Sequence, residues 1–320
     1  MRQRILQGAA ATLTVTLADQ NGSPADAAGA LTVSVALADG TSVLPAGTAT
    51  THGSTGVYNV ALTSAQTSSL NLLTAVWTDV GNSRTVTTMH EIVGGFFFSL
   101  ADARASNNGL IANTTNYPDQ SILDTRYEVE EEAENICDVA FVPRYHRATL
   151  DGWASSDIML PHNRIRTIRS VRIYPVVGGS TYTALTSTQL AALVVDDDGL
   201  VHRTDFGFFD EGRGNIVIEY ERGWDAPPAQ IKAASLIRLR NRLNAKGITG
   251  LDEHTSNFTG EDGQTFNLTT AGVWTTGIPE VDAAYERYSY RSRGVAGMKG
   301  ASMPLNLDPQ RYSIFHGGIR

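Results

Sequence analysis

Residues 11–92 repeat one pattern, in which short runs of alternating apolar and small polar residues are separated by turn residues such as Asn21-Gly22 and Asp39-Gly40. A period of two is typical of strands that bury one side and expose the other. The runs are short and rich in Thr and Val, which favours an antiparallel sandwich. We therefore predict an immunoglobulin-like β-sandwich over residues 1–95, with Trp77 filling its core.

Helical spacing replaces this pattern after Gly94-Gly95. From Pro118 onward, apolar residues recur on one stripe and acidic residues share another face, which predicts an acidic amphipathic helix over 118–141. The acidic face consists of Asp124, Glu128, Glu131 and Asp138. Further helices are predicted over 229–246, which follows two prolines and ends in a basic turn, and over 279–291, which begins at a proline.

Strand-like alternation between the first two helices predicts a β insertion over 142–224. The expected fold is thus multidomain, β plus α+β. The sandwich precedes a helical bundle with a β insertion, over residues 96–293, and an extended C-terminal arm, over 294–320.

The C-terminal end combines charge with apolar residues. Residues 287–320 carry six Lys or Arg residues against Asp308 as the one acidic residue. The arm is also too apolar to be an idle tail, so we expect it to dock on a partner. Its candidate binding residues are Leu305, Leu307, Arg311, Tyr312, Ile314 and Phe315.

Composition narrows the function classes. The chain has 320 residues, 42% apolar and 18% charged, with a net charge of −8, so we expect a soluble globular protein without a bulk electrostatic grip on nucleic acid. We find neither a long apolar span nor a signal-peptide core, and expect no membrane span and no cleaved signal. The single cysteine, Cys137, excludes a disulfide framework and is expected to be a small buried side chain.

Catalytic and metal motifs are absent from the sequence. Asp196-Asp197-Asp198-Gly199 does not match a calcium loop, because the first ligand position falls on Val194, and an acidic turn is the simpler interpretation. The seven histidines are scattered, and no Gly-x-Ser-x-Gly motif occurs. We expect no enzyme activity, no catalytic or metal-binding residues and no cofactor, although residues distant in sequence can still come together in a fold.

The densest basic cluster is formed by Arg164, Arg166, Arg169 and Arg172. Three interpretations stay open. The arginines can form an ordinary solvated strand face, or a nucleic-acid patch, although no aromatic interleaving accompanies them. Alternatively, they pair with the acidic helix face of a neighbouring subunit in a ring, because arginine binds carboxylates with bidentate geometry.

An ordered set of short motifs runs through the second part of the chain. It consists of Tyr117-Pro118-Asp119, the acidic helix through Cys137, Phe141-Val142-Pro143-Arg144, Leu160-Pro161-His162-Asn163-Arg164-Ile165, Val217-Ile218-Glu219-Tyr220-Glu221-Arg222-Gly223-Trp224, the helix after Pro227-Pro228, and Gly277-Ile278-Pro279-Glu280-Val281-Asp282. On this order of elements, the stretch from Phe98 to Tyr290 resembles the head–tail connector (adaptor) family of long-tailed bacteriophages. The N-terminal sandwich is additional to the family pattern.

The resemblance implies a structural virion protein at the head–tail interface, assembled in the host bacterial cytoplasm. Such connectors form a ring of about twelve copies beneath the portal protein. The implied partners are the portal, a downstream connector or tail-terminator protein, and further copies of the chain. Genome DNA would pass through the lumen without specific binding.

Two other function classes stay open. A surface-glycan-binding or adhesive tail protein would expose an aromatic platform, for which Tyr58 and Trp77 are the candidates in the sandwich, although their alternation places them in its core. A hydrolytic tail enzyme would need a pair of carboxylates in a cleft.

Overall fold

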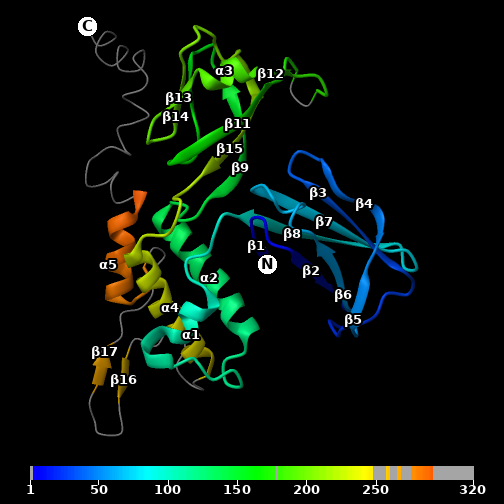
Figure 1. Cartoon of the computed structure of the whole chain (residues 1–320), viewed down its shortest axis with the longest axis vertical. Helices are drawn as coiled ribbons and strands as arrows, with labels where there is room; N and C mark the ends of the chain where they lie inside the picture. Colours follow the sequence, from blue (N-terminus) through cyan, green and yellow to red (C-terminus); the bar gives the residue numbers. More distant parts are fainter. Residues whose placement is uncertain (1–2, 177–178, 248–256, 260–264, 268–274, 291–320) are drawn as a thin grey trace. The chain divides into compact units, whose positions relative to one another are not determined.

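The computed structural model describes residues 3–176, 179–247, 257–259, 265–267 and 275–290 (Figure 1). It is mostly β-sheet with a smaller number of helices, and it divides into two compact units. The first unit joins the residues up to Phe96 with Val142–Ala226, and the second joins Phe97–Phe141 with the residues from Pro227 onward. The chain therefore has several parts, as predicted, and each unit contains two separate stretches of sequence.

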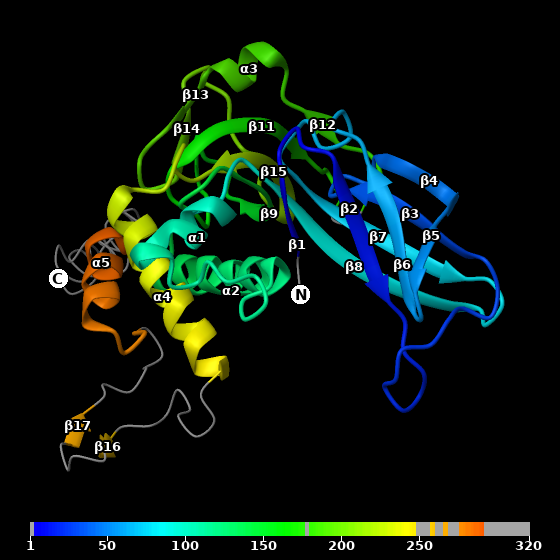
Figure 2. The same cartoon turned by 60° about the horizontal axis from the view of Figure 1, so that its bottom comes forward.

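Two sheets enclose one core in the N-terminal region (Figure 2). The larger sheet has the order β1-β8-β7-β3-β4, and the smaller has the order β2-β6-β5. Residues from both sheets, including Val15, Val60 and Trp77, form the shared core, because strands such as β2 and β7 bury alternate side chains. The strands are β1 (Gln3–Leu6), β2 (Ala11–Thr16), β3 (Leu31–Leu37), β4 (Ser42–Ala49), β5 (Thr51–Ser54), β6 (Val57–Leu62), β7 (Asn71–Asp79) and β8 (Arg84–Val93).

The β insertion forms the rest of the first unit. Its main sheet has the order β12-β11-β15-β9, and a smaller sheet has the order β10-β14-β13. Antiparallel register places Val171 opposite Ile218, and both are buried in the insertion's core with Tyr220. The elements are β9 (Arg144–Gly152), β10 (Asp157–Met159), β11 (Ile165–Ile173), β12 (Thr183–Ala184), α3 (Ser187–Ala191), β13 (Leu193–Val195), β14 (Leu200–Arg203) and β15 (Gly212–Arg222).

The sandwich is bonded to the insertion within this unit. The Gly94 amide donates to the Pro143 carbonyl over 2.8 Å, and a Cβ on Gly94 would lie 2.6 Å from the proline ring. Next to this bond, Arg144 donates from Nε and Nη2 to the two carboxylate oxygens of Glu91, each over 2.6 Å. Glu91 is only 2% exposed, so a buried ion pair fixes β8 to β9.

Helices account for most of the described residues of the second unit, and α2 packs against α1, α4 and α5. The three predicted helices are confirmed, each within a few residues. The first ends at Cys137 and not at 141, because Asp138 adopts a left-handed conformation, with φ of 55°. An additional helix, α1, begins at a Ser99 capping box. The elements are α1 (Leu100–Gly109), α2 (Asp119–Cys137), α4 (Ala229–Gly247), β16 (Asn257–Thr259), β17 (Thr265–Asn267) and α5 (Pro279–Tyr288).

Cys137 is buried, as predicted. Burial, with the negative charge of Glu134 as a lesser cause, raises the pKa of its thiol to about 12. The thiol therefore stays protonated and unreactive at neutral pH. Among the residues that the structure describes, no helix is long and apolar enough to cross a membrane.

Candidate interface residues

The arginine cluster lies on β11 and just before it. Its antiparallel neighbour β15 carries Glu219 and Glu221, which are opposite Ser170 and Thr167 in the register. Each carboxylate is therefore beside arginines that are one or two residues along the neighbouring strand, and this spacing favours cross-strand ion pairs.

Arg169 makes the best-formed of these pairs. Its Nε and Nη2 atoms donate to one oxygen of Glu221 over 2.8 and 2.5 Å, and its Nη1 donates to the Leu70 carbonyl of the sandwich over 2.6 Å. Arg147 of β9 likewise donates to the Ala38 carbonyl over 2.6 Å. Arginines of the insertion thus bind loop carbonyls of the sandwich at two further points.

The other three arginines also have neighbours in the same chain. Arg166 donates to Asp225 over 2.5 Å, and an Arg172 nitrogen is 3.7 Å from Glu219. The Arg164 guanidinium stacks 3.8 Å above the ring of Trp224. The cluster is thus a partly exposed strand face whose charges are balanced locally, and its pairing with a second subunit stays a prediction.

On the acidic helix, glutamates form ion pairs with arginines of another helix. On α2, Glu128 accepts from Arg242 of α4 over 3.0 Å, and Glu132 accepts two bonds of 2.9 Å from Arg238. Asp124, Glu131 and Asp138 are exposed. Glu128 was predicted to belong to the acidic face, but the α4 arginines were not predicted as its partners, although their spacing of four residues puts both on one helix face.

Two further glutamates of α2 are buried and accept backbone hydrogen bonds. Glu130 accepts from the Phe97 amide over 2.8 Å, and Glu134 accepts from the Phe141 amide over 3.3 Å. Both amides belong to the segments where the chain enters and leaves the first part of this unit. These carboxylates serve the fold, because a buried amide without an acceptor would be costly.

An exposed aromatic loop is a feature that the sequence analysis missed. Phe206 and Phe208, between β14 and β15, are 94% and 61% exposed. Trp153, which follows β9, is 77% exposed and lies in the segment that bridges to this loop through Ser155 and Phe209. The signal in the sequence is the run Asp205-Phe206-Gly207-Phe208-Phe209-Asp210, in which aromatic residues lie between charged ones.

A buried arginine determines the conformation of the aromatic loop. Arg203 is only 6% exposed, binds both oxygens of Asp205 over 3.0 and 2.7 Å, and donates to the Phe208 carbonyl over 2.9 Å. The hydrogen bonds from Arg203 lower the pKa of the Asp205 carboxyl to about 2. At position 207, a Cβ would lie 2.1 Å from the Arg203 guanidinium, so any larger residue would displace this arginine from its bonds to the loop.

Phe206 has a backbone conformation that is unusual for an aromatic residue. Its φ is +58°, in the left-handed region, which costs roughly 1–2 kcal/mol for a residue other than glycine. The loop therefore holds a strained residue whose side chain is almost fully in water. The bonds of the buried Arg203 to the residues on either side of Phe206 hold it in this conformation.

A histidine pair lies at the other end of the insertion sheet. The rings of His146 and His162 are 4.2 Å apart, and the His162 Nδ1 is 2.7 Å from the Tyr220 hydroxyl. Burial, followed by the positive charge of Arg222, lowers the pKa of His146 to about 4 and that of His162 to about 3. Both are neutral at pH 7.

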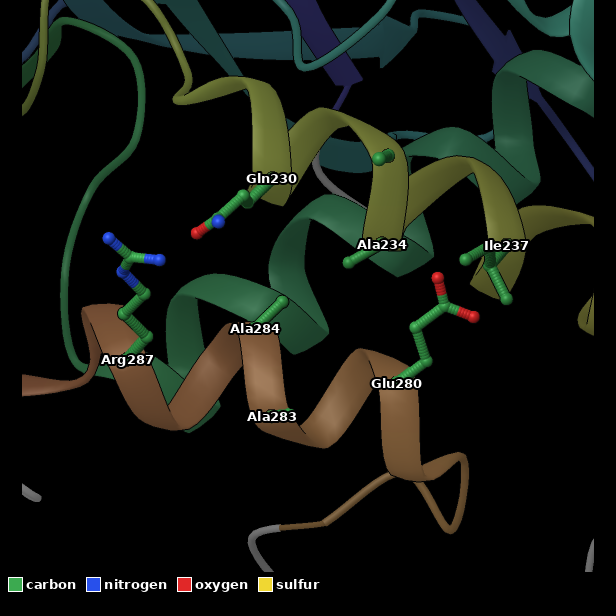
Figure 3. Close-up of a pocket in the computed structure, with 8 residues that line it drawn as sticks. Gln230, Ala234, Ile237, Glu280, Ala283, Ala284 and Arg287 are labelled. Atoms are coloured by element: carbon green, nitrogen blue, oxygen red, sulfur yellow. The ribbon is translucent and has the colours of Figure 1, made fainter.

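A shallow pocket of about 360 Å³ lies between α4 and α5 in the second unit (Figure 3). Four alanines, two from each helix, and Ile237 form its apolar wall. Glu280 and Arg287, each one residue from an end of α5, extend toward α4, and Gln230 lies near Arg287. The pocket thus offers small apolar side chains between a negative and a positive group.

The other residues predicted from the sequence lie in the core of the sandwich or outside the described part of the chain. The two aromatic residues considered for a glycan platform are buried, because Trp77 is 0% exposed and Tyr58 is 8% exposed. No group of three metal-ligating side chains occurs among the residues that the structure describes. The arm, with Leu305, Leu307, Arg311, Tyr312, Ile314 and Phe315, lies outside the described residues.

Comparisons with known proteins gave structural likeness only. No family model matches the sequence, and no curated protein matches it. A chain from the neck of an empty gene transfer agent particle, computed with C6 symmetry, has a TM-score of 0.40 at 15% identity, over 60% of this chain and 88% of that one. A chain from the virion of a native gene transfer agent particle has a TM-score of 0.40 at 16% identity, over 59% and 86%.

A third chain comes from the neck of a native particle computed with C12 symmetry. It has a TM-score of 0.37 at 14% identity, over 62% of this chain and 94% of that one. At these values the likeness carries no functional conclusion.

Proposed function

We propose that this chain is a structural virion protein, a head–tail connector (adaptor) that forms a ring of about twelve copies under the portal and has no enzymatic activity. The observation that supports this best is the order of elements. Helix α2, the β insertion, α4 and α5 follow one another as the connector resemblance requires. Helices α2 and α4 pack together although the whole insertion separates them in sequence.

In this proposal, copies assemble side by side around the channel through which genome DNA leaves the head. The chain's net charge of −8 supports passage of DNA without specific binding, because an acidic wall repels phosphate. The exposed acidic residues of α2 and the arginines of β11 remain candidates for contacts between subunits. A downstream connector or tail-terminator protein would bind the face of the ring that points away from the portal.

The N-terminal sandwich, which we assign to the immunoglobulin-like class, would be held firmly by the insertion. Glu91 and the carbonyls of Ala38 and Leu70 all accept bonds from arginines of the insertion. This bonding favours an integral part of the connector over a loosely tethered appendage.

The ring proposal is tested with the full-length chain, alone and mixed with its portal protein. We expect mass photometry to detect a closed oligomer of about twelve copies, and cryo-electron microscopy to locate it under the portal. A chain that stays monomeric under both conditions, at concentrations where phage necks assemble, would rule out the connector assignment.

The C-terminal arm is proposed to attach the ring to the portal, with Leu305, Tyr312 and Phe315 as anchors. Deleting residues 300–320 is expected to abolish co-assembly with the portal and to leave the circular dichroism spectrum unchanged. The arm would have no such role if the truncated chain bound the portal with wild-type affinity.

A further inference from the structure

The aromatic loop has the properties of a binding element. Phe206 and Phe208 are 94% and 61% exposed, yet the loop that carries them is held by the buried Arg203 and its bonds to Asp205. A fixed loop loses little conformational freedom on binding, and aromatic side chains dominate the energetics of protein interfaces. Both features favour insertion of these rings into a partner's apolar pocket.

The pocket between α4 and α5 is suited to such side chains. Alanines from both helices leave space between them, and the volume of about 360 Å³ can hold aromatic rings (Figure 3). Ala233 and Ala283 are exposed at its rim, so the pocket opens to solvent.

Both the loop and the pocket have acidic and basic residues beside them, so opposite charges can meet in a contact. Asp210 and Glu211 follow the loop and are exposed, and Arg213 is exposed two residues further on. The pocket has Arg287 at one end and Glu280 at the other. In a contact between the loop and the pocket, the acidic residues would face Arg287 and Arg213 would face Glu280.

We propose that the aromatic loop of one copy inserts Phe206 and Phe208 into the α4–α5 pocket of a second copy. This inference builds on the proposed ring and identifies the surfaces that would close it. Loop and pocket are different surfaces, so each copy offers its loop to one neighbour and its pocket to the other. A head-to-tail contact of this kind closes into a ring when the rotation between copies allows it.

Disulfide trapping tests the contact directly. Cys137 is buried, so Phe206→Cys and Ala283→Cys each introduce one accessible thiol. The two full-length variants are mixed and oxidised with copper-phenanthroline. We expect a linked dimer that contains one copy of each variant, identified by mass spectrometry. Val80→Cys, at an exposed apolar residue of the sandwich, replaces Phe206→Cys as the matched control and is expected not to link to Ala283→Cys.

Loss of the rings provides the second measurement. Phe206→Ser with Phe208→Ser is expected to raise the concentration needed for half-assembly at least about tenfold, because buried aromatic anchors carry much of the affinity of an interface. Val80→Ser is expected to leave this concentration unchanged. Circular dichroism and thermal unfolding check that both variants fold. We expect them to fold, because the substituted side chains are exposed.

The outcomes separate this inference from the proposed function. A wild-type chain that forms rings without the mixed disulfide, or a double variant that assembles like wild type, would overturn the loop–pocket contact and leave the ring intact. A wild-type chain that forms no ring with or without portal would overturn both. A mixed disulfide together with weakened assembly of the double variant would support the contact.

Discussion

Glu91 is buried on β8 and accepts two hydrogen bonds from Arg144 of β9. Arg144→Met would leave this carboxylate buried without its main partner, and we expect the free energy of unfolding to fall by about 3–5 kcal/mol. Urea denaturation, followed by tryptophan fluorescence, measures the change. Arg166→Met is the matched control, because its closer partner Asp225 is largely exposed, Glu221 at 3.9 Å keeps Arg169 as a partner, and exposed pairs contribute about 1 kcal/mol or less. Equal effects of the two variants would contradict this account of Glu91.

The histidine pair predicts how stability depends on pH. His146 and His162 have folded-state pKa values lowered to about 4 and about 3, mainly by burial. In the unfolded chain they take up protons near pH 6.5, while in the folded chain they do not. Stability is therefore unaffected by these groups above pH 6.5 and falls as the pH drops from there toward 4.

Thermal unfolding at a series of pH values checks this prediction. His162→Gln keeps a polar side chain near the Tyr220 hydroxyl but cannot take up a proton, so we expect a shallower loss of melting temperature between pH 6.5 and 4. An unchanged slope in the variant would show that other groups cause the loss.

At the scale of elements, the packing of α2 on α4 depends on arginine geometry. Arg238 binds both oxygens of Glu132, and a lysine offers a single point charge in place of this planar fork. Arg238→Lys is expected to reduce the free energy of unfolding by about 1.5–3 kcal/mol. Arg240→Lys, two residues along the same helix, is expected to change it by less than about 0.5 kcal/mol. Chemical denaturation measures the free energy of unfolding of both variants. Similar losses in the two would contradict the role given to Arg238.

The elements could be predicted from sequence where a local period sets them. The apolar stripe of Ile122, Val129 and Ala133 identifies α2, and Pro279 marks the start of α5. Helix α1 was missed because it is short and buries only Ala103. The pairing of Arg169 with Glu221 could not be predicted, because it depends on the register of two strands about fifty residues apart. The candidate arginines were thus identified, but not their partners.

At the scale of the whole molecule, the bonds from the insertion to the sandwich predict the result of removing residues 1–95. Arg144, Arg147 and Arg169 would lose acceptors in the sandwich. We expect the shortened chain to unfold at a lower temperature and to yield less soluble protein than the full chain. Differential scanning calorimetry makes the comparison, and a shortened chain as stable as the full one would favour a tolerated appendage.

The two-stretch composition of the first unit also has a consequence for synthesis. Arg144 lies 53 residues after Glu91, with the first helices of the second unit translated between them. On a ribosome that adds roughly 5–20 residues per second, Arg144 is synthesised about 3–10 s after Glu91. For these seconds the Glu91 carboxylate on the last strand of the nascent sandwich stays hydrated. The sandwich can therefore bind the insertion only late in translation.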